Sequence, residues 1–150
     1  MALAEHGSPQ RKLYLVLRFT GLRVQQAMEL LWDDFDLPGA VLHVRPELGK
    51  TQQEKQGRWI PSSEHLVREL AGWGKREGYR IPTHRRWVAK QRSDRQARSR
   101  DARRAWDRAV EQYGVRPDVT QQPHHAFRKG FVTGLKRLGA GVDAVEVLVD

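Results

Sequence analysis

The sequence predicts a mainly helical α+β fold, built as a single domain with a small antiparallel β hairpin or sheet. The chain has 150 residues, the usual size of one domain. Apolar residues make up 39% of it, and in several segments they recur at intervals of three and four, as on one face of a helix. Only two short segments are typical of strands. No segment approaches the roughly 18 apolar residues of a membrane-spanning helix, and the N-terminus lacks the apolar centre of a signal peptide.

Two helices are predicted in the N-terminal part. The first begins at Ser8-Pro9, because a hydroxyl cap followed by proline is typical of a helix start, and it ends at Gly21. Leu13, Val16, Leu17 and Thr20 follow at helical spacing and form its stripe. The second helix runs from about Val24 to Leu31. A turn region is predicted after it, formed by Asp33, Asp34, Asp36 and Pro38-Gly39.

The middle of the chain predicts the β structure. Two short strands, Val41–Val44 and residues 58–60, are joined by a polar loop over residues 49–57, so we expect them to pair as a hairpin. Residues 63–73 are expected to be helical, with Leu66, Leu70 and Trp73 on one stripe.

Three further helices are predicted in the C-terminal half. One has the stripe Ala102, Trp106, Ala109 and Tyr113, and a loop over residues 114–123 follows it. The next has the stripe Phe127, Phe131, Leu135 and Leu138 and ends at Gly139. The last covers residues 142–149. Trp32, Trp59 and Trp73 are expected in the core, and for Trp87 and Trp106 packing is favoured over stacking on a sugar or base.

Positive charge is concentrated in one block. The chain has 27 Lys and Arg against 18 Asp and Glu, a formal net charge of +9, and residues 76–108 contain 12 basic residues against 4 acidic ones. Most of the 12 are Arg, whose planar fork fits phosphate. Such a block favours a polyanionic partner, with nucleic acid ahead of an anionic membrane surface. The candidate DNA contacts are Arg85, Arg86, Lys90, Arg92, Arg95, Arg98, Arg103 and Lys129.

Several classes of site are excluded or disfavoured by composition. The chain has no Cys, which excludes disulfides, thiolate zinc sites and a Cys nucleophile. Its six His show no ligand spacing with acidic partners, so we expect neither a metal nor any other cofactor.

Three local patterns carry candidate chemistry. Arg23 follows the helix-ending Gly21, Lys50 lies in the Gly49-Lys50-Thr51 segment of the hairpin loop, and His125 and Arg128 are three residues apart on one helix face. We expect this face to lie opposite a buried Phe127, Phe131 and Leu135 stripe. Cations and an imidazole without paired carboxylates suit a phosphodiester: guanidinium groups hold the non-bridging oxygens, and a Lys and a His move protons.

Together these patterns resemble the tyrosine recombinases, or phage-type integrases. Their catalytic domain contains a Thr-Gly-Leu-Arg element, a hairpin Lys, a His-x-x-Arg element, a later His or Trp, and then a nucleophilic Tyr. The resemblance begins near residue 12 and extends to the last residue, and it implies the fold of that catalytic domain. It also implies that Arg23 and Arg128 clamp the scissile phosphate, that Lys50 is the general acid for the 5′-oxygen, and that His125 assists proton transfer.

The chain departs from the family pattern in three respects. Gln26 stands where the family usually has a Glu that braces the first Arg, and Lys129 replaces the His that often follows the second. None of Tyr14, Tyr79 and Tyr113 follows Arg128, so we expect a catalytic domain that stops before its nucleophile and cannot form the phosphotyrosyl intermediate. The family's separate N-terminal DNA-clamping domain is expected to be absent as well.

Two other functions stay open. One is a non-catalytic DNA-binding remnant or regulator, and the other is a domain of the type IB topoisomerase kind, which uses similar residues. An RNA-binding protein is disfavoured because no aromatic-rich sheet motif occurs. The resemblance implies double-stranded DNA as partner, a DNA-bound tetramer for the full-length parent, and a monomeric or weakly associated fragment. It also implies a cytoplasmic, nucleoid-associated location without membrane binding.

Overall fold

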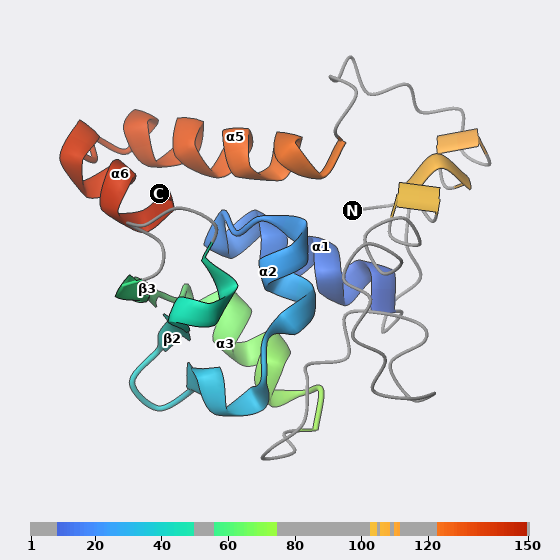
Figure 1. Ribbon diagram of the computed structural model, residues 1–150, viewed down its shortest axis with the longest axis horizontal. Coiled ribbons are helices and arrows are strands. Elements are labelled where there is room, and N and C mark those ends of the chain that lie inside the picture. Colours follow the sequence, from blue (N-terminus) through green and yellow to red (C-terminus); the bar gives the residue numbers. More distant parts are fainter. Residues whose placement is uncertain are drawn as a thin grey trace.

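The computed structural model describes residues 9–49, 56–74, 103–104, 106–108, 110–111 and 123–149. In this part of the chain, helices cover one face of a three-stranded antiparallel sheet of order β1-β2-β3 (Figure 1). The elements are α1 (Pro9–Thr20), α2 (Val24–Glu29), η1 (Trp32–Asp34), β1 (Phe35–Asp36), β2 (Val41–Val44), η2 (Pro46–Leu48), β3 (Arg58–Pro61), α3 (Glu64–Ala71), α5 (Pro123–Arg137) and α6 (Val142–Val149). The predicted mainly helical α+β fold is confirmed. None of the described helices is long and apolar enough to cross a membrane.

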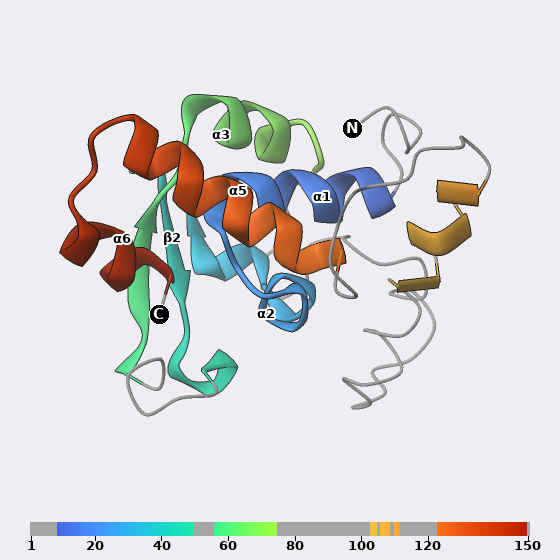
Figure 2. The same ribbon diagram turned by 90° about the horizontal axis from the view of Figure 1, so that it is seen from above.

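Helix α1 forms the centre of the molecule. It begins at Pro9 and stops before Gly21, which has a left-handed φ of +65°, as the sequence predicts. The predicted stripe is buried, and Leu15 between its members is buried too, because α1 has neighbours on more than one side. Helices α2 and α3 contact it, and α5 lies along it (Figure 2).

The segment after α2 differs from the prediction. Helix α2 ends at Glu29 rather than at Leu31, and residues 32–34 form the short 3-10 helix η1. The carboxylate of Asp34 accepts a hydrogen bond from the Leu31 backbone N–H at 2.8 Å, so this acidic side chain organises the helical turn locally.

Strand β1 occupies part of the predicted turn region. Phe35 pairs with Leu42 and Asp36 with Val41, so the expected hairpin is extended to three strands. The turn itself is confined to residues 37–40, where Asp36 Oδ1 accepts a hydrogen bond from Gly39 N at 3.0 Å. Pairing with β2 across this turn outweighs the local turn preference of the aspartates here.

The sheet places alternate residues on opposite faces. Leu42 and Ile60 are paired and both are fully buried. Their neighbours His43 and Trp59 are also paired, with stacked rings 4.4 Å apart, but they lie on the outer face. Trp59 is 62% exposed, so its expected place in the core is wrong. The period of two along β3 allows only one of Trp59 and Ile60 to face inward.

Helix α3 completes the core. Leu66 and Leu70 are fully buried as predicted, and Ser63 caps the helix by accepting from Leu66 N at 3.3 Å. Trp32 is 1% exposed, so its predicted place in the core is confirmed. Trp73 is only half-buried and packs against the edge of the core.

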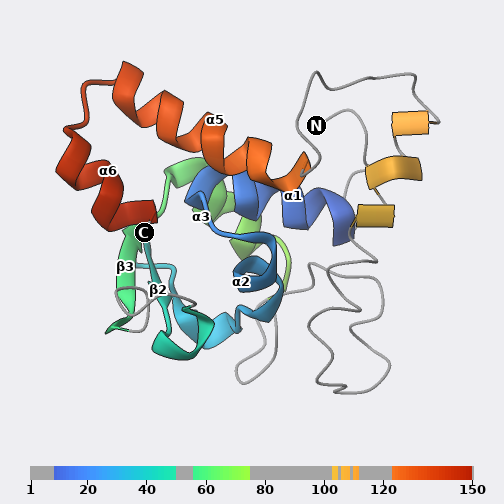
Figure 3. The same ribbon diagram turned by 45° about the horizontal axis from the view of Figure 1, so that its top comes forward.

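The C-terminal helices α5 and α6 form a pair that turns back onto the sheet. Gly139, with φ of +85°, follows α5, and α6 runs back beside β3 (Figure 3). Val145 of α6 is buried. Leu138, predicted on the buried stripe of α5, is instead 86% exposed, because it lies beyond the last turn of the helix at the outer corner.

The burial of α5 also corrects the predicted helix face. Phe127, Phe131 and Leu135 are only half-buried, whereas Arg128 is 9% exposed. His125, on the same face as Arg128, is exposed. The face expected to point away from the molecule therefore carries the most buried side chain of the helix, because α1 ends beneath Arg128.

Residues 103–104, 106–108 and 110–111, here named the Trp106 segment, are helical as predicted. The Trp106 ring meets Tyr14 of α1 edge-on at 5.5 Å and Phe127 of α5 at 6.0 Å. Packing of Trp106 against other side chains is therefore confirmed. The predictions for Trp87, Ala102, Ala109, Tyr113 and the loop up to residue 122 concern residues outside the described part.

Candidate functional site

The site is built where α5 crosses the end of α1. Arg128 Nη1 donates a hydrogen bond to the backbone carbonyl of Gly21 at 3.2 Å, in a buried position. A Cβ added at Gly21 would lie 2.5 Å from Cδ1 of Phe131, so the glycine permits both the left-handed turn and the close approach of α5. Residues 107 positions apart in the sequence are thereby brought into direct contact.

The turn that presents Arg23 is held by Thr20. The Thr20 hydroxyl donates to Val16 O at 2.7 Å and accepts from Leu22 N at 3.3 Å, and its side chain is fully buried. Arg23 follows with an extended backbone and precedes the first residue of α2. Its side chain is half-buried. The Thr-Gly-Leu-Arg element is therefore a turn with fixed hydrogen bonds rather than a loose connection.

His125 lies close enough to both arginines for their charges to act on it. Its pKa is lowered, first by partial burial and then by the positive charges of Arg128, Arg23 and Lys129. A lowered pKa keeps the imidazole neutral at pH 7, in the form that can accept a proton. Arg23, His125 and Arg128 thus share one cationic site, while Lys129 lies beside it on α5 with an exposed side chain.

Gln26 supports the backbone of Arg23. As the third residue of α2, it accepts a hydrogen bond from Arg23 N through Oε1 at 3.0 Å, which is the backward half of a capping box. Its Nε2 donates to Leu48 O of η2 at 3.3 Å. The sequence left open how Arg23 is supported with Gln in place of the family's Glu, and this amide provides the answer for the backbone.

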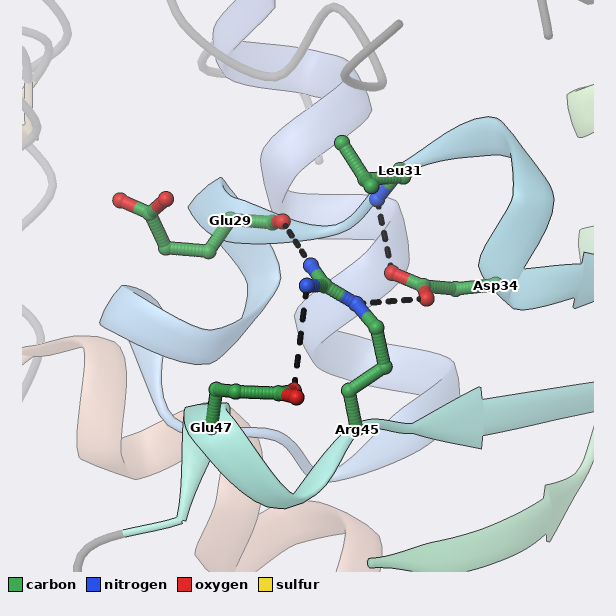
Figure 4. A network of polar contacts seen from close by, with 5 residues as sticks. All are labelled: Glu29, Leu31, Asp34, Arg45 and Glu47. Carbon is green, nitrogen blue, oxygen red and sulfur yellow. Dashed lines mark hydrogen bonds and ion pairs between the residues drawn. The ribbon is translucent and has the colours of Figure 1, made fainter. Parts of the chain in front are cut away.

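A polar network fixes η2 against the other end of α2, and sequence analysis missed it. Arg45 Nη2 donates to Glu29 O at 2.9 Å, and Arg45 Nε forms a 2.7 Å ion pair with Asp34 Oδ1 (Figure 4). Glu47 lies at the ion-pair limit of 4.0 Å from Nη1. The spacing of Arg-x-x-Gln at a helix start could have indicated the bond between Gln26 and Arg23 N. No local sequence pattern indicates that Arg45 binds Asp34 and Glu29, which lie 11 and 16 residues before it.

Several predicted site residues fall outside the described part of the chain. These are Lys50, the candidate general acid, and the basic residues Arg85, Arg86, Lys90, Arg92, Arg95 and Arg98. Of the predicted DNA contacts in the basic block, Arg103 is described: it is exposed and forms a 2.8 Å ion pair with Asp107 one turn later.

His124, next to His125, belongs to a different environment. It packs near Tyr14 and Trp106, at ring distances of 6.3 and 6.2 Å. Burial lowers the His124 pKa to about 4, with a further lowering by Arg103 and an opposing effect of Asp107. Burial likewise raises the pKa of the Tyr14 hydroxyl to about 12, with an added effect of Asp107. His124 is therefore part of the packing, not a polar residue facing solvent at the helix start.

Among the described residues, no three His, Asp or Glu side chains are grouped so that they could hold a metal ion. Arg23, His125 and Arg128 are cationic or neutral side chains, which suit an anionic group.

Comparison with protein families decides the affiliation of the chain. The model of the phage integrase family matches residues 2–150. The chain belongs to this family. The predicted resemblance to the tyrosine recombinases and phage-type integrases is therefore confirmed. No curated protein matches the chain.

Solved structures of this family share the fold of the chain. The Tn1549 transposon integrase, in complex with circular intermediate DNA, matches with a TM-score of 0.65 at 19% identity, over 92% of this chain and 50% of the integrase chain. XerA recombinase matches with a TM-score of 0.65 at 20% identity, over 94% of this chain and 47% of its own. A variant of the Tn1549 integrase with transposon right end DNA gives a TM-score of 0.65 at 18% identity, over 94% and 50%. The chain thus spans about half the length of these integrase-family structures.

Proposed function

We propose that this chain is the DNA-binding catalytic core of a site-specific tyrosine recombinase or integrase, which cuts and rejoins DNA strands without a cofactor. The proposal rests above all on one contact. Arg128 hydrogen-bonds the carbonyl of Gly21, two residues before Arg23, and both guanidinium groups act on His125. Two arginines beside a neutral imidazole form a site for one phosphodiester group.

Each side chain has a proposed task. Arg23 and Arg128 hold the non-bridging oxygens of the scissile phosphate and offset the charge that builds up during transfer. His125, whose pKa is lowered, accepts or returns the proton of the attacking hydroxyl. Lys50, two residues after Leu48, gives its proton to the departing 5′-oxygen.

The attacking tyrosine of strand cleavage is not Tyr14. Tyr14 is 3% exposed and its ring packs against both Trp106 and Phe127, and its pKa is raised to about 12. A hydroxyl so placed neither reaches DNA nor ionises readily. We therefore still expect that residues 1–150 alone do not form the phosphotyrosyl intermediate. In the whole protein, we propose that other segments supply the nucleophile and the DNA-clamping domain.

The proposed partner is double-stranded DNA, which would place the protein in the cytoplasm with the nucleoid. The exposed cations Arg103, of the Trp106 segment, and Lys129, of α5, would contact the DNA backbone, together with the predicted basic residues 85–98. For the whole protein we propose a tetramer on DNA, and for this chain alone a monomer or a weak association.

A joining reaction tests the site without a tyrosine nucleophile. The substrate is a pool of nicked DNA duplexes. At the nick, the 3′ end of one strand carries a phospho-4-nitrophenyl ester, and it lies next to a free 5′-hydroxyl. The 5′-oxygen attacks phosphorus, the nicked strand is sealed, and 4-nitrophenol leaves. We expect the wild-type chain to accelerate joining, and Arg23→Ala or Arg128→Ala to slow it by about a hundredfold, the usual effect of removing a transition-state donor.

The matched control is Arg18→Ala, on the exposed side of α1, which should join at the wild-type rate. If the wild-type chain binds the duplex but does not join it, the chain is a non-catalytic DNA-binding module instead. If joining survives both arginine substitutions, the assigned roles of Arg23 and Arg128 are wrong.

A further inference from the structure

The side-chain amide of Gln26 is buried, and both its oxygen and its nitrogen form hydrogen bonds. The residue is 3% exposed, and its Oε1 accepts from Arg23 N at 3.0 Å while its Nε2 donates to Leu48 O at 3.3 Å. The first bond is local to the start of α2, whereas the second crosses 22 residues to η2. Gln26 therefore links the start of α2 to η2.

The amide makes both of these bonds at neutral pH because it combines an acceptor and a donor. A carboxylate can accept from Arg23 N but has no hydrogen to donate to Leu48 O, and an alkyl group can do neither. In a buried position the loss is large, because the carbonyl left behind has no water to replace its donor. The Gln at this position is thus matched to its two partners by chemistry and not only by size.

The far side of the bridge is itself fixed. Arg45, which precedes η2, is bound to Glu29 O at the C-terminal end of α2 and to Asp34 of η1 (Figure 4). With Gln26 acting near the N-terminal end of α2, η2 is attached to this short helix at both ends. A shift of η2 along α2 would break one attachment or the other.

The geometry points to Gln26 as a positioning residue, a neutral amide clamp that couples the turn carrying Arg23 to η2 and holds the two in register regardless of pH. Its significance for phosphate binding rests on the function proposed above, whereas the clamp itself does not. Arg23 gains a fixed backbone, and Leu48, two residues before Lys50, gains a fixed distance from that backbone.

Gln26→Glu keeps the acceptor for Arg23 N but removes the donor to Leu48 O. Gln26→Met has a similar volume and removes both hydrogen bonds. The matched control is Gln25→Glu, which adds the same charge one residue earlier on α2, at a half-buried position. The readout is amide hydrogen exchange by NMR. The Arg23 amide reports the first bond, and the Gly49 amide, bonded to Pro46 O at 3.0 Å, reports the order of η2.

At pH 8 we expect Gln26→Glu to leave the protection of the Arg23 amide against exchange unchanged. The protection of the Gly49 amide should fall about tenfold, the usual effect of one lost hydrogen bond. Lowering the pH protonates the new carboxyl, which can then donate to Leu48 O, so the protection of Gly49 should return. Gln26→Met should lose both at every pH. Wild-type-like protection of both amides in Gln26→Met and Gln26→Glu would overturn the clamp.

DNA affinity, measured by fluorescence anisotropy, gives the functional arm. Gln26→Glu should bind a duplex several-fold more weakly than Gln25→Glu at pH 8 and equally well at pH 5.5, and this difference should vanish when Arg23→Ala is added to both. An unchanged difference in the Arg23→Ala background would show that Gln26 does not act through Arg23. If the wild-type chain binds no DNA, the proposed function fails, while the exchange experiment still decides whether the clamp exists.

Discussion

The guanidinium of Arg128 hydrogen-bonds the backbone carbonyl of Gly21 at 3.2 Å, across the contact between α5 and α1. Because the donor is buried and the acceptor belongs to the turn before Arg23, this bond sets the spacing of two arginines that lie far apart in the sequence. It also explains why the residue before Leu22 is glycine: Phe131, one turn after Arg128, occupies the space that a Cβ would need.

Gly21→Ala should destabilise the protein by about 3 kcal/mol, because it combines a left-handed backbone with overpacking against Phe131. Chemical denaturation measures the loss. Gly134→Ala, in the last turn of α5, is the matched control. A Cβ there meets nothing within 4 Å, so this variant should leave stability unchanged or raise it slightly. Adding Phe131→Ala to Gly21→Ala should recover only the part caused by overpacking; full recovery would refute the role of the turn.

Acid should destabilise the chain through His124. Its pKa falls from an ordinary 6.5 to about 4 on folding, so between these values the unfolded chain binds more protons than the folded one. The free energy of unfolding is therefore unaffected by His124 above pH 6.5 and decreases as the pH falls towards 4, by at most about 3 kcal/mol. His124→Phe, which retains a ring beside Tyr14, should flatten this part of the pH profile. Identical profiles for both proteins would contradict the assignment.

Arg45→Met should destabilise the protein by about 3 kcal/mol, because it leaves Asp34, 4% exposed, without its cation. Asp34→Asn should cost less, since its side-chain oxygen can still accept from Leu31 N. The coupling energy between positions 34 and 45, from denaturation of the single and double variants, should exceed 1 kcal/mol, roughly the limit for an exposed pair. Additive effects would show that the ion pair contributes nothing beyond its parts.

Binding to duplex DNA should weaken steeply with salt, because neutralised phosphates release counterions. Lys129→Ala should reduce the slope of log affinity against log salt by about one, and so should Arg103→Ala. Arg68→Ala on α3, an exposed Arg paired with Glu64 and outside the predicted contacts, should leave the slope unchanged. Equal effects of all three substitutions would indicate general charge attraction instead of a defined surface.

Local sequence patterns predicted most elements because their causes are local. Proline at the first position and glycine past the last define α1, and the spacing of Leu66 and Leu70 defines the buried face of α3. The errors share a different cause. Phe35-Asp36 became a strand through its pairing with residues 41 and 42, and Trp59 was turned outward by the alternation that buries Ile60. Both outcomes depend on which strands pair with each other, and the preferences of the individual residues do not show that pairing.

By itself, the sequence determined the mainly helical composition, the small antiparallel sheet and the order of motifs that identifies the family, since propensity, periodicity and spacing are properties of neighbouring residues. Tertiary structure alone decided that Arg128 is buried against Gly21, that Gln26 bridges Arg23 to Leu48, and that His124 and His125 face different surroundings. Such contacts arise from the way α5 and η2 pack on α1 and α2. Burial and long-range hydrogen bonds are set by that packing, which adjacent residues do not encode.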